Sequence, residues 1–316
     1  MLEMEKLIVI AGPTAVGKTE VGIELAREIG GEIVSADSRQ VYRFMDIGTA
    51  KPSPEDMRRI PHHMIDVVNP DEEYSAADYS SGAHAAIESI FDRNKIPVMV
   101  GGSGLYIRTV IDGLFSGPGS NRETRGRLEA EAEKNGLSSL HDRLSRIDPA
   151  ASSRIHPNDK RRIIRALEIY EVTGQPISSL QKEWKSKNAE YHTIMVGLNR
   201  PREELYERIE ERVELIFRCG FVEEVKTLLE KGYGENLISM EALGYRQVVE
   251  FLKGKISLES AKERIAQDTR HYAKRQLTWF RKDKRITWFN IQNYEQPRET
   301  AEKIRQFLKK TGCFPI

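Results

Sequence analysis

The chain is poor in cysteine, with two in 316 residues, Cys219 and Cys313, and no CxxC pair. This excludes a cysteine-based zinc module and gives no disulfide framework. No window approaches the roughly 20 apolar residues that a membrane helix needs. The N-terminal residues lack an apolar region followed by a small-residue cleavage site, so no signal peptide is predicted. We therefore expect a cytoplasmic protein with no membrane association.

Excess charge, internal repeats and low-complexity segments are also missing. Lys and Arg number 49 against 48 Asp and Glu, a net charge of +1, so the chain as a whole does not indicate a polyanion-binding protein. Apolar residues make up 39% and charged residues 31%, which is typical of a soluble globular protein with charged helix faces. The length allows roughly two domains.

Short apolar runs alternate with helical patterns in the first third of the chain. Strands are expected at residues 7–10, 33–35, 64–67 and 97–100. Helices are expected between them, at 19–29 and 76–91. This alternation is typical of βαβ units and predicts a P-loop NTPase-like α/β fold with a parallel sheet flanked by helices.

The pattern changes near residue 113 and is helical from 119 to 191, with breaks at Pro149, Pro157 and Gly174. Later elements are expected as a strand at 192–198, helices at 202–220, 221–231 and 258–281, and a strand at 286–290. We therefore expect a discontinuous α/β core, residues 1–118 and 192–316 with C-terminal helices, and an all-α insertion at 119–191.

The segment GPTAVGKT matches GxxxxGK[ST] between an expected strand and an expected helix. We call it the P-loop; it comprises Gly12, Pro13, Thr14, Ala15, Val16, Gly17, Lys18 and Thr19. Its glycines let backbone N–H groups converge on an anion at a helix N-terminus. Lys18 supplies a cation for the phosphates and Thr19 a hydroxyl ligand for Mg²⁺.

The features of a nucleotide-hydrolysing P-loop protein are missing. The strand at 97–100 ends in Gly101-Gly102 where such a protein has a Mg²⁺-binding Asp, and there is no NKxD. Asp66 is a weak candidate for that Asp and is better interpreted as a strand-end carboxylate. The sequence favours transfer from a bound phosphate or diphosphate compound over hydrolysis.

Asp37 follows the strand at 33–35, at the sheet edge where ligands of such folds bind. A carboxylate there can accept a hydrogen bond from an amine or hydroxyl and take its proton. Gln40 carries the donor and acceptor needed to read an adenine edge. The alternative is a helix-capping Asp37 or Ser38 beside a solvated Arg39 and Gln40.

Two stretches are basic: residues 154–165 with net charge +4, and residues 270–285 with net charge +6 and interleaved aromatic residues. Each is either an RNA-binding surface or a solvated helix face. Trp279 fits either a core position or a base-stacking position. His62 and His63 lack a third ligand at usable spacing, so capping or packing is expected for them and not metal binding.

Several further motifs occur in a fixed order with the P-loop: DSRQVY (37–42), DIGTAKP (46–52), YSAADY (74–79), GGSGLY (101–106), HPNDKRR and RALE (156–168), LYERIEERV (205–213), LGYRQ (243–247) and AKRQLTWFR (273–281). Together they resemble the bacterial tRNA dimethylallyltransferase, or tRNA isopentenyltransferase, family (IPP transferases), from residue 8 to about 289.

This resemblance implies a prenyl transfer. Dimethylallyl diphosphate would give its five-carbon group to N6 of adenosine 37 in tRNAs that read codons beginning with U, and pyrophosphate would leave. Asp37 would be the general base, and Lys18, the loop amides and Mg²⁺ held by Thr19 would stabilise the leaving group. Arg212 would contact the diphosphate, with Arg208 beside it. The alternative for both arginines is a structural ion pair with Glu204 or Glu211 on the same helix.

The resemblance also implies tRNA contacts, at Asp37, Ser38, Arg39, Gln40, Ser103, Arg125, Arg161, Arg162, Arg165, Lys274 and Arg275. Ser103 stands where the family usually has Thr, with the hydroxyl retained. Adenosine 37 would be extruded into the pocket and read by Gln40. The insertion resembles a lid that grips the anticodon stem-loop, made mobile by the Gly/Pro joint at 113–120, and the family implies a monomer.

Three alternatives share parts of this pattern. A small-molecule P-loop kinase would turn over ATP and would not need the basic stretches. An adenylate isopentenyltransferase would prenylate free AMP and lack the insertion. A non-catalytic, nucleotide-gated RNA-binding protein would have no use for Asp37.

Overall fold

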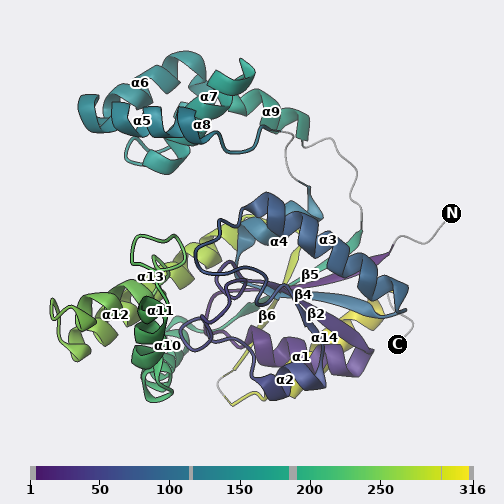
Figure 1. The fold of residues 1–316 in the computed structure, drawn as a ribbon. Helices are drawn as coiled ribbons and strands as arrows, with labels where there is room; N and C mark the ends of the chain where they lie inside the picture. Colours follow the sequence, from purple (N-terminus) through teal and green to yellow (C-terminus); the bar gives the residue numbers. More distant parts are fainter. Residues whose placement is uncertain (1–4, 114–116, 185–190, 293, 313–316) are drawn as a thin grey trace. The chain divides into compact units, whose positions relative to one another are not determined.

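One parallel sheet organises the larger part of the molecule (Figure 1). Its strands are β1 (Lys6–Ala11), β2 (Gly31–Ala36), β3 (His62–His63), β4 (Ile96–Gly101), β5 (His192–Asn199) and β6 (Ile286–Asn290), in the order β3-β2-β4-β1-β5-β6. The central runs KLIVIA and IPVMVG are almost wholly buried, as expected when helices cover both faces. The predicted α/β fold with a parallel sheet is confirmed.

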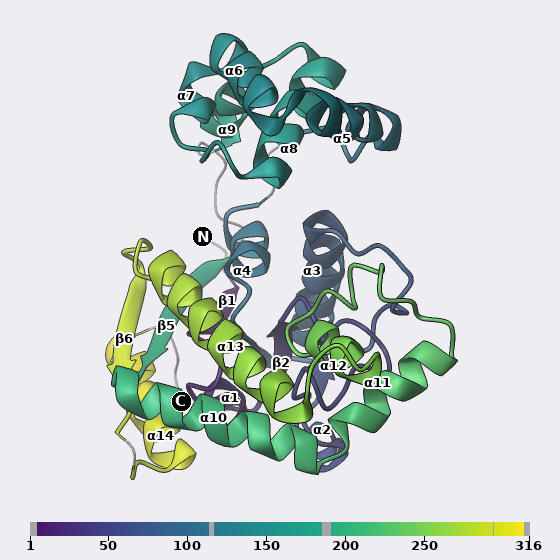
Figure 2. The same ribbon diagram turned by 90° about the vertical axis from the view of Figure 1, so that its left-hand side faces the viewer.

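In a computed structural model, residues 5–113, 117–184, 191–292 and 294–312 are described. Helix α1 (Lys18–Ile29) packs beside α14 (Pro297–Lys310) on one face of the sheet, and α3 (Ala76–Asp92) packs beside α4 (Gly104–Ile111) on the other (Figures 1 and 2). The remaining helices of this unit are α2 (Pro54–Arg59), α10 (Arg202–Arg218), α11 (Phe221–Glu230), α12 (Tyr245–Leu252) and α13 (Leu258–Phe280). Among the described residues, no helix is long and apolar enough to span a bilayer.

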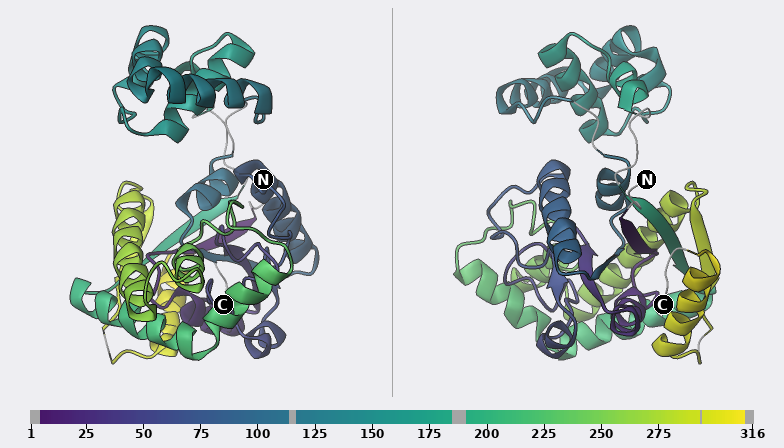
Figure 3. Two further views of the ribbon diagram at one scale, coloured as in Figure 1. Left: turned by 60° about the vertical axis from the view of Figure 1, so that its left-hand side comes forward. Right: turned by 90° about the vertical axis from the view of Figure 1, so that its right-hand side faces the viewer.

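The chain divides into two compact units, Met1–Ile111 with Glu190–Ile316, and Asp112–Ala189. The second is all-α, with α5 (Arg122–Asn135), α6 (Leu137–Ile147), α7 (Pro149–Ser152), α8 (Lys160–Thr173) and α9 (Ile177–Trp184) (Figure 3). It has its own apolar core, which includes Leu128, Leu140, Leu144, Ile163 and Leu167.

The second unit begins before residue 119 because its entry segment is bonded to α8. Arg165 donates to the carbonyls of Pro118 (2.7 Å) and Gly119 (3.3 Å). Part of the expected joint, residues 114–116, lies outside the described residues, as does Cys313.

The strand predicted at residues 64–67 is wrong. The third strand is only His62–His63, and the chain then turns, because Met64 (φ 64°) and Asp66 (φ 56°) have left-handed backbone that cannot continue a ladder. Asp66 is an ion-pair partner of Lys51. His63 Nε2 hydrogen-bonds with Glu32 (2.8 Å), and His62 Nδ1 with the Ile60 carbonyl (2.7 Å).

Strand register brings the motifs of the sequence together. Ala11 is the register partner of Gly101 and of Gly197, and Ala36 is also a partner of Gly101. The segments that follow β1, β2, β4 and β5 therefore emerge side by side at the carboxyl edge of the sheet. This is the edge where open α/β sheets bind their ligands.

Candidate active site

A cleft of about 880 Å³ lies at this carboxyl edge. Four segments far apart in sequence form it: the P-loop with the start of α1, the end of β2, residues 49–53, and the end of β4. Helices α10 and α13 close it with Arg208, Arg212, Tyr272 and Gln276. All lining residues belong to the larger unit.

The P-loop wraps as the glycines of its motif predict. Gly17 caps α1 with a left-handed backbone, φ 104°. At Gly12 a side chain has no room, because a Cβ would lie 2.8 Å from the Leu198 carbonyl oxygen on β5. The Lys18 ammonium reaches back to the Pro13 carbonyl (2.6 Å) and therefore lies inside the loop.

Two arginines bind the outer carbonyls of the loop. Arg208 Nε donates to the Ala15 oxygen (2.9 Å), and Arg200 Nε donates to the Val16 oxygen (3.0 Å). Ala15 is held with φ 63°, which is uncommon for a residue with a side chain. These contacts fix the loop and put positive charge beside carbonyl dipoles that would otherwise repel an anion.

The cations of the cleft are desolvated. Burial lowers the pKa of Lys18 to about 8, and the negative charge of Asp37 opposes this shift only in part. Burial also lowers the pKa of Arg212. Arg212 donates to the Thr14 hydroxyl (3.3 Å) and to the Thr49 carbonyl (3.5 Å). An anion bound here would restabilise the charged forms of both side chains.

Asp37 lines the same cleft, directly after β2. Its Oδ1 accepts the Arg39 N–H (2.8 Å), so it caps its own turn while it lines the cleft. The two interpretations of Asp37 are therefore compatible. Ser38 N–H donates to the Ser103 hydroxyl (3.0 Å), which joins the segments after β2 and β4.

Gln40 has its amide engaged inside the protein. Its Oε1 accepts from the Ser35 hydroxyl (2.9 Å), and its Nε2 donates to the carbonyls of Ala50 (3.2 Å) and Thr49 (3.5 Å). The side chain is 9% exposed. Reading a base edge would require these bonds to break. Arg39 reaches across to the Ile238 carbonyl (2.9 Å).

In the helical unit, two of the predicted tRNA-binding arginines converge on one buried carboxylate. Glu168 accepts from Asn121 N–H (2.6 Å), Arg165 (2.9 Å) and Arg125 (3.2 Å). Arg161 and Arg162 are exposed on the same helix, and Arg162 pairs with Asp159 (3.4 Å). The basic stretch is therefore partly an internal network and partly an exposed face.

Lys274 and Arg275 are exposed on α13, the helix that also contributes Tyr272 and Gln276 to the cleft. Arg275 lies over the Tyr272 ring, 5.7 Å from its centroid. Trp279 packs on Gly104, where a Cβ would lie 2.3 Å from the indole, yet it stays 41% exposed.

Among the residues that bond to the loops around the cleft, Arg200, Gln276 and Glu224 were not assigned a role from the sequence, and of these only Gln276 lines the cleft itself. Arg200 could have been found, because it follows β5 at the ligand-binding edge. Gln276 lies within AKRQLTWFR, but its position gives no hint of its partners. Glu224 on α11 accepts the N–H groups of Asp46 (2.8 Å), Ile47 (2.6 Å) and Gly48 (3.1 Å), and no pattern in the sequence indicates this.

The donor set of the cleft suits a metal held mainly by substrate. Thr19 lines the cleft, and the described residues contain no cluster of three or more His, Cys, Asp or Glu that could hold an ion. Mg²⁺ commonly binds through one or two protein oxygens together with phosphate oxygens and water. The Thr19 hydroxyl fits that role, whereas Asp66 is committed to Lys51.

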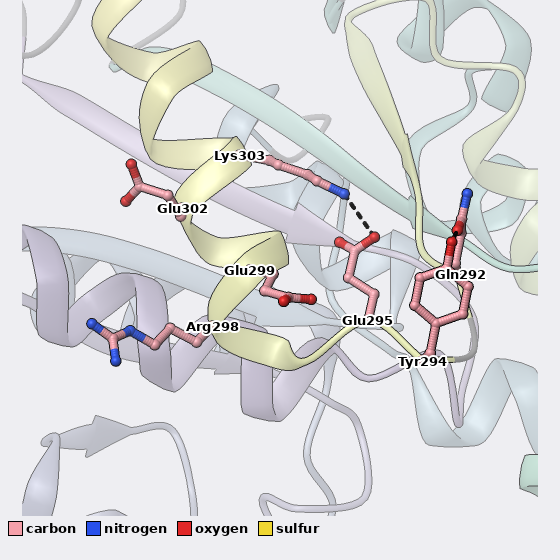
Figure 4. Close-up of a pocket in the computed structure, with 7 residues that line it drawn as sticks. All are labelled: Gln292, Tyr294, Glu295, Arg298, Glu299, Glu302 and Lys303. Atoms are coloured by element: carbon pink, nitrogen blue, oxygen red, sulfur yellow. Dashed lines mark hydrogen bonds and ion pairs between the residues drawn. The ribbon is translucent and has the colours of Figure 1, made fainter.

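A second hollow, of about 630 Å³, lies along α14 (Figure 4). In it Lys303 points toward Glu295, at 2.7 Å, and Tyr294 lies beside Gln292. Its lining is mixed in charge, with three glutamates beside Arg298 and Lys303, and is drawn from residues 292–303. It does not include the strand ends that carry the motifs.

Comparisons with known proteins show which family the chain is similar to. The profile of the IPP transferase family matches residues 40–283. A tRNA dimethylallyltransferase of Alkaliphilus oremlandii is 49% identical over 306 residues, covering 96% of this chain and 97% of the relative. Another, of Geobacter sulfurreducens, is 51% identical over 283 residues, covering 90% and 91%.

Two solved structures are similar over nearly the whole chain. The full-length tRNA isopentenylpyrophosphate transferase of Bacillus halodurans has a TM-score of 0.70 and 41% identity, covering 98% of both chains. A eukaryotic dimethylallyltransferase acting on tRNA has a TM-score of 0.80 and 29% identity, covering 98% of this chain and 79% of the other. The resemblance seen in the sequence is thereby confirmed, and the chain belongs to the IPP transferase family.

Proposed function

We propose that this chain transfers a dimethylallyl group from dimethylallyl diphosphate to N6 of adenosine 37 in tRNAs that read codons beginning with U. As a family member it is a prenyl transferase that acts on tRNA. The observation that carries the finer proposal is the presence of Lys18, Arg212 and Asp37 in one cleft. It combines an anion-binding loop with a carboxylate that can accept a proton.

The donor is bound through its diphosphate. Lys18, Arg212 and the P-loop N–H groups bind the phosphate oxygens, with Arg208 behind the loop at the Ala15 carbonyl. These cations are partly desolvated, so they interact strongly with charge that grows on the leaving group. Thr19 would hold Mg²⁺ beside the diphosphate, where the ion would neutralise part of that charge.

The acceptor reacts through its exocyclic amine. The adenine N6 attacks C1 of the dimethylallyl group, the C1–O bond breaks, and its electron pair leaves with pyrophosphate. Asp37 takes the proton from N6. One Asp37 oxygen is engaged by the Arg39 N–H, so the other is available to the substrate amine in this proposal.

The RNA is held mainly through its phosphates. We assign this role to Arg161, Arg162, Lys274 and Arg275, which lie on exposed helix faces. Arg125 and Arg165 contribute with the N–H groups that remain beyond their bonds to Glu168 and, for Arg165, to the carbonyls of Pro118 and Gly119. Adenosine 37 leaves the anticodon stack and enters the cleft beside Ser38, Arg39 and Ser103. Gln40 shapes the pocket wall through residues 49–50. The enzyme acts as a cytoplasmic monomer.

The test uses the purified full chain, Mg²⁺, labelled dimethylallyl diphosphate and an anticodon stem-loop. We expect label in the RNA with adenosine at position 37 and none with guanosine there. Free AMP as acceptor and ATP as donor are the controls. Label in AMP would identify an adenylate isopentenyltransferase instead. ATP consumption without prenyl transfer would identify a kinase.

A further inference from the structure

Gln276 joins two loops of the cleft that are distant in sequence. It is 7% exposed on α13. Its Oε1 accepts the Thr14 N–H of the P-loop (2.8 Å), and its Nε2 donates to the Gly102 carbonyl after β4 (2.9 Å). Both halves of the amide are therefore used, one on each loop.

The contact with the second loop depends on glycine. A Cβ at Gly102 would lie 2.3 Å from the Gln276 Nε2, so a larger residue would displace the amide. The Gly102 backbone can therefore approach the Gln276 amide this closely because glycine has no side chain.

Thr14 is held from two sides. Gln276 takes its N–H, and Arg212 donates to its hydroxyl (3.3 Å). An N–H that is engaged by a protein carbonyl is not offered to an anion, so the anion-binding part of the loop begins after Thr14. The direction of the Arg212 guanidinium depends in turn on where the Thr14 hydroxyl lies.

The same helix reaches the acceptor side. Tyr272, four residues before Gln276, lines the cleft together with Asp37. One face of α13 therefore borders both the P-loop and the Asp37 side of the cleft.

We propose that Gln276 is a positioning residue for the transfer reaction, which fixes Thr14 and, through Thr14, the Arg212 guanidinium on the donor side of the cleft. The inference rests on the proposed function. It predicts that loss of the Gln276 amide disturbs diphosphate binding and transfer although Gln276 itself does no chemistry.

The test compares Gln276→Met with Gln247→Met. Gln247 is a matched control: it is 2% exposed, accepts the Gly244 N–H (3.0 Å), donates to Asp268 (2.8 Å) and does not line the cleft. We measure pyrophosphate affinity with Mg²⁺ by calorimetry, and single-turnover transfer to the stem-loop, each per folded protein. Gln276→Met should weaken pyrophosphate binding about tenfold, because Thr14 and with it the Arg212 guanidinium lose their fixed positions, and should slow transfer. Gln247→Met should lower only thermal stability.

A double-mutant cycle tests the route through Thr14. Thr14→Val keeps the N–H but removes the hydroxyl that Arg212 binds. If Gln276 acts through Thr14, the two substitutions are non-additive in pyrophosphate affinity. Additive effects, or a Gln276→Met variant that behaves like Gln247→Met, would overturn the proposal. If Gln276→Met does not fold, Gln276→Asn replaces it, since the shorter amide cannot span both loops.

The wild-type protein separates this inference from the proposed function. If wild type does not transfer the label to RNA, the proposed function fails, while the pyrophosphate measurement still reports on Gln276.

Discussion

Asp37 and Lys18 illustrate how single residues acquire their chemistry from the cleft. Lys18 lies inside the P-loop, and burial lowers its pKa to about 8. Its charged form is therefore under-stabilised until an anion binds beside it. Asp37 raises that pKa in part and is itself held by its own turn. In the proposed reaction, the two opposite charges mark the donor and acceptor sides of the cleft.

Asp37→Asn should leave the turn intact, because the amide oxygen can still accept the Arg39 N–H, but it removes the base. We expect the single-turnover transfer rate to fall by about 10²–10⁴-fold, with stem-loop affinity unchanged. Asp71→Asn, an exposed carboxylate, is the control. A rate close to that of wild type would remove Asp37 as the proton acceptor.

At the scale of elements, helices hold the functional loops by bonds between distant segments. On α11, Glu224 binds three successive N–H groups of residues 46–48 and the Tyr245 hydroxyl (2.7 Å). The Glu224 carboxylate has four acceptor positions for these four donors. A glutamine side chain in its place would instead point its two amide N–H donors at some of them. The loop also carries the Thr49 carbonyl that Arg212 binds.

Glu224→Gln should therefore lower the free energy of unfolding by about 2 kcal/mol, as expected for a hydrogen bond to a charged group, and slow transfer. Glu223→Gln, on an exposed position of the same helix, should do neither. Chemical denaturation and the transfer assay measure the two effects. Equal behaviour of both variants would show that the loop does not need this carboxylate.

On α8, Glu168 and Glu171 each bind two arginines. Glu168 binds Arg125 and Arg165, and Glu171 binds Arg127 and Arg143. Glu168→Gln should weaken stem-loop binding about tenfold through misplaced arginines, whereas Glu171→Gln should not. A similar loss of affinity in both variants would mean that the helical unit needs only general stability.

The Glu168 network also predicts a pH dependence. Burial alone would raise the pKa of Glu168, but the hydrogen bonds from Arg165, Asn121 and Arg125 outweigh it, and the folded pKa is below 4.5. A carboxyl with a lowered folded pKa stabilises the protein above its unfolded value, and this contribution is lost as the pH falls through the folded value. The stability difference between wild type and Glu168→Gln should therefore be present at pH 7 and shrink below about pH 4.5.

At the scale of the whole molecule, each unit has its own core, and the cleft is lined by the larger one alone. Replacing residues 119–189 with a flexible glycine–serine linker should leave pyrophosphate binding with Mg²⁺ intact and abolish stem-loop binding. Calorimetry and a filter-binding assay measure the two. Undiminished RNA affinity would assign the RNA contacts to α13 and its neighbours.

Much of this architecture is predictable because its signals are local. Apolar runs of strand length between helical patterns predict a parallel sheet. The P-loop motif is expected between a strand and a helix, and it lies between β1 and α1. The strand predicted at 64–67 rested on the apolar composition of this segment. The prediction failed because Met64 and Asp66 adopt a left-handed backbone, which a strand cannot contain. Helices α2, α4 and α12 were not predicted because they span only six to eight residues, whereas α14 was missed although Ala301, Ile304 and Leu308 recur in it at helical spacing.

The sequence by itself determined the fold class, the anion-binding loop and the carboxylate after β2, because each depends on neighbours within a few residues. Only the tertiary structure decided that Gln40 faces inward, that Glu168 holds two of the basic residues, and that Gln276 binds a P-loop N–H 262 residues away. The physical reason is that a buried polar group must find its partner in the folded chain. Register and helix packing select that partner, and no pattern of adjacent residues records the choice.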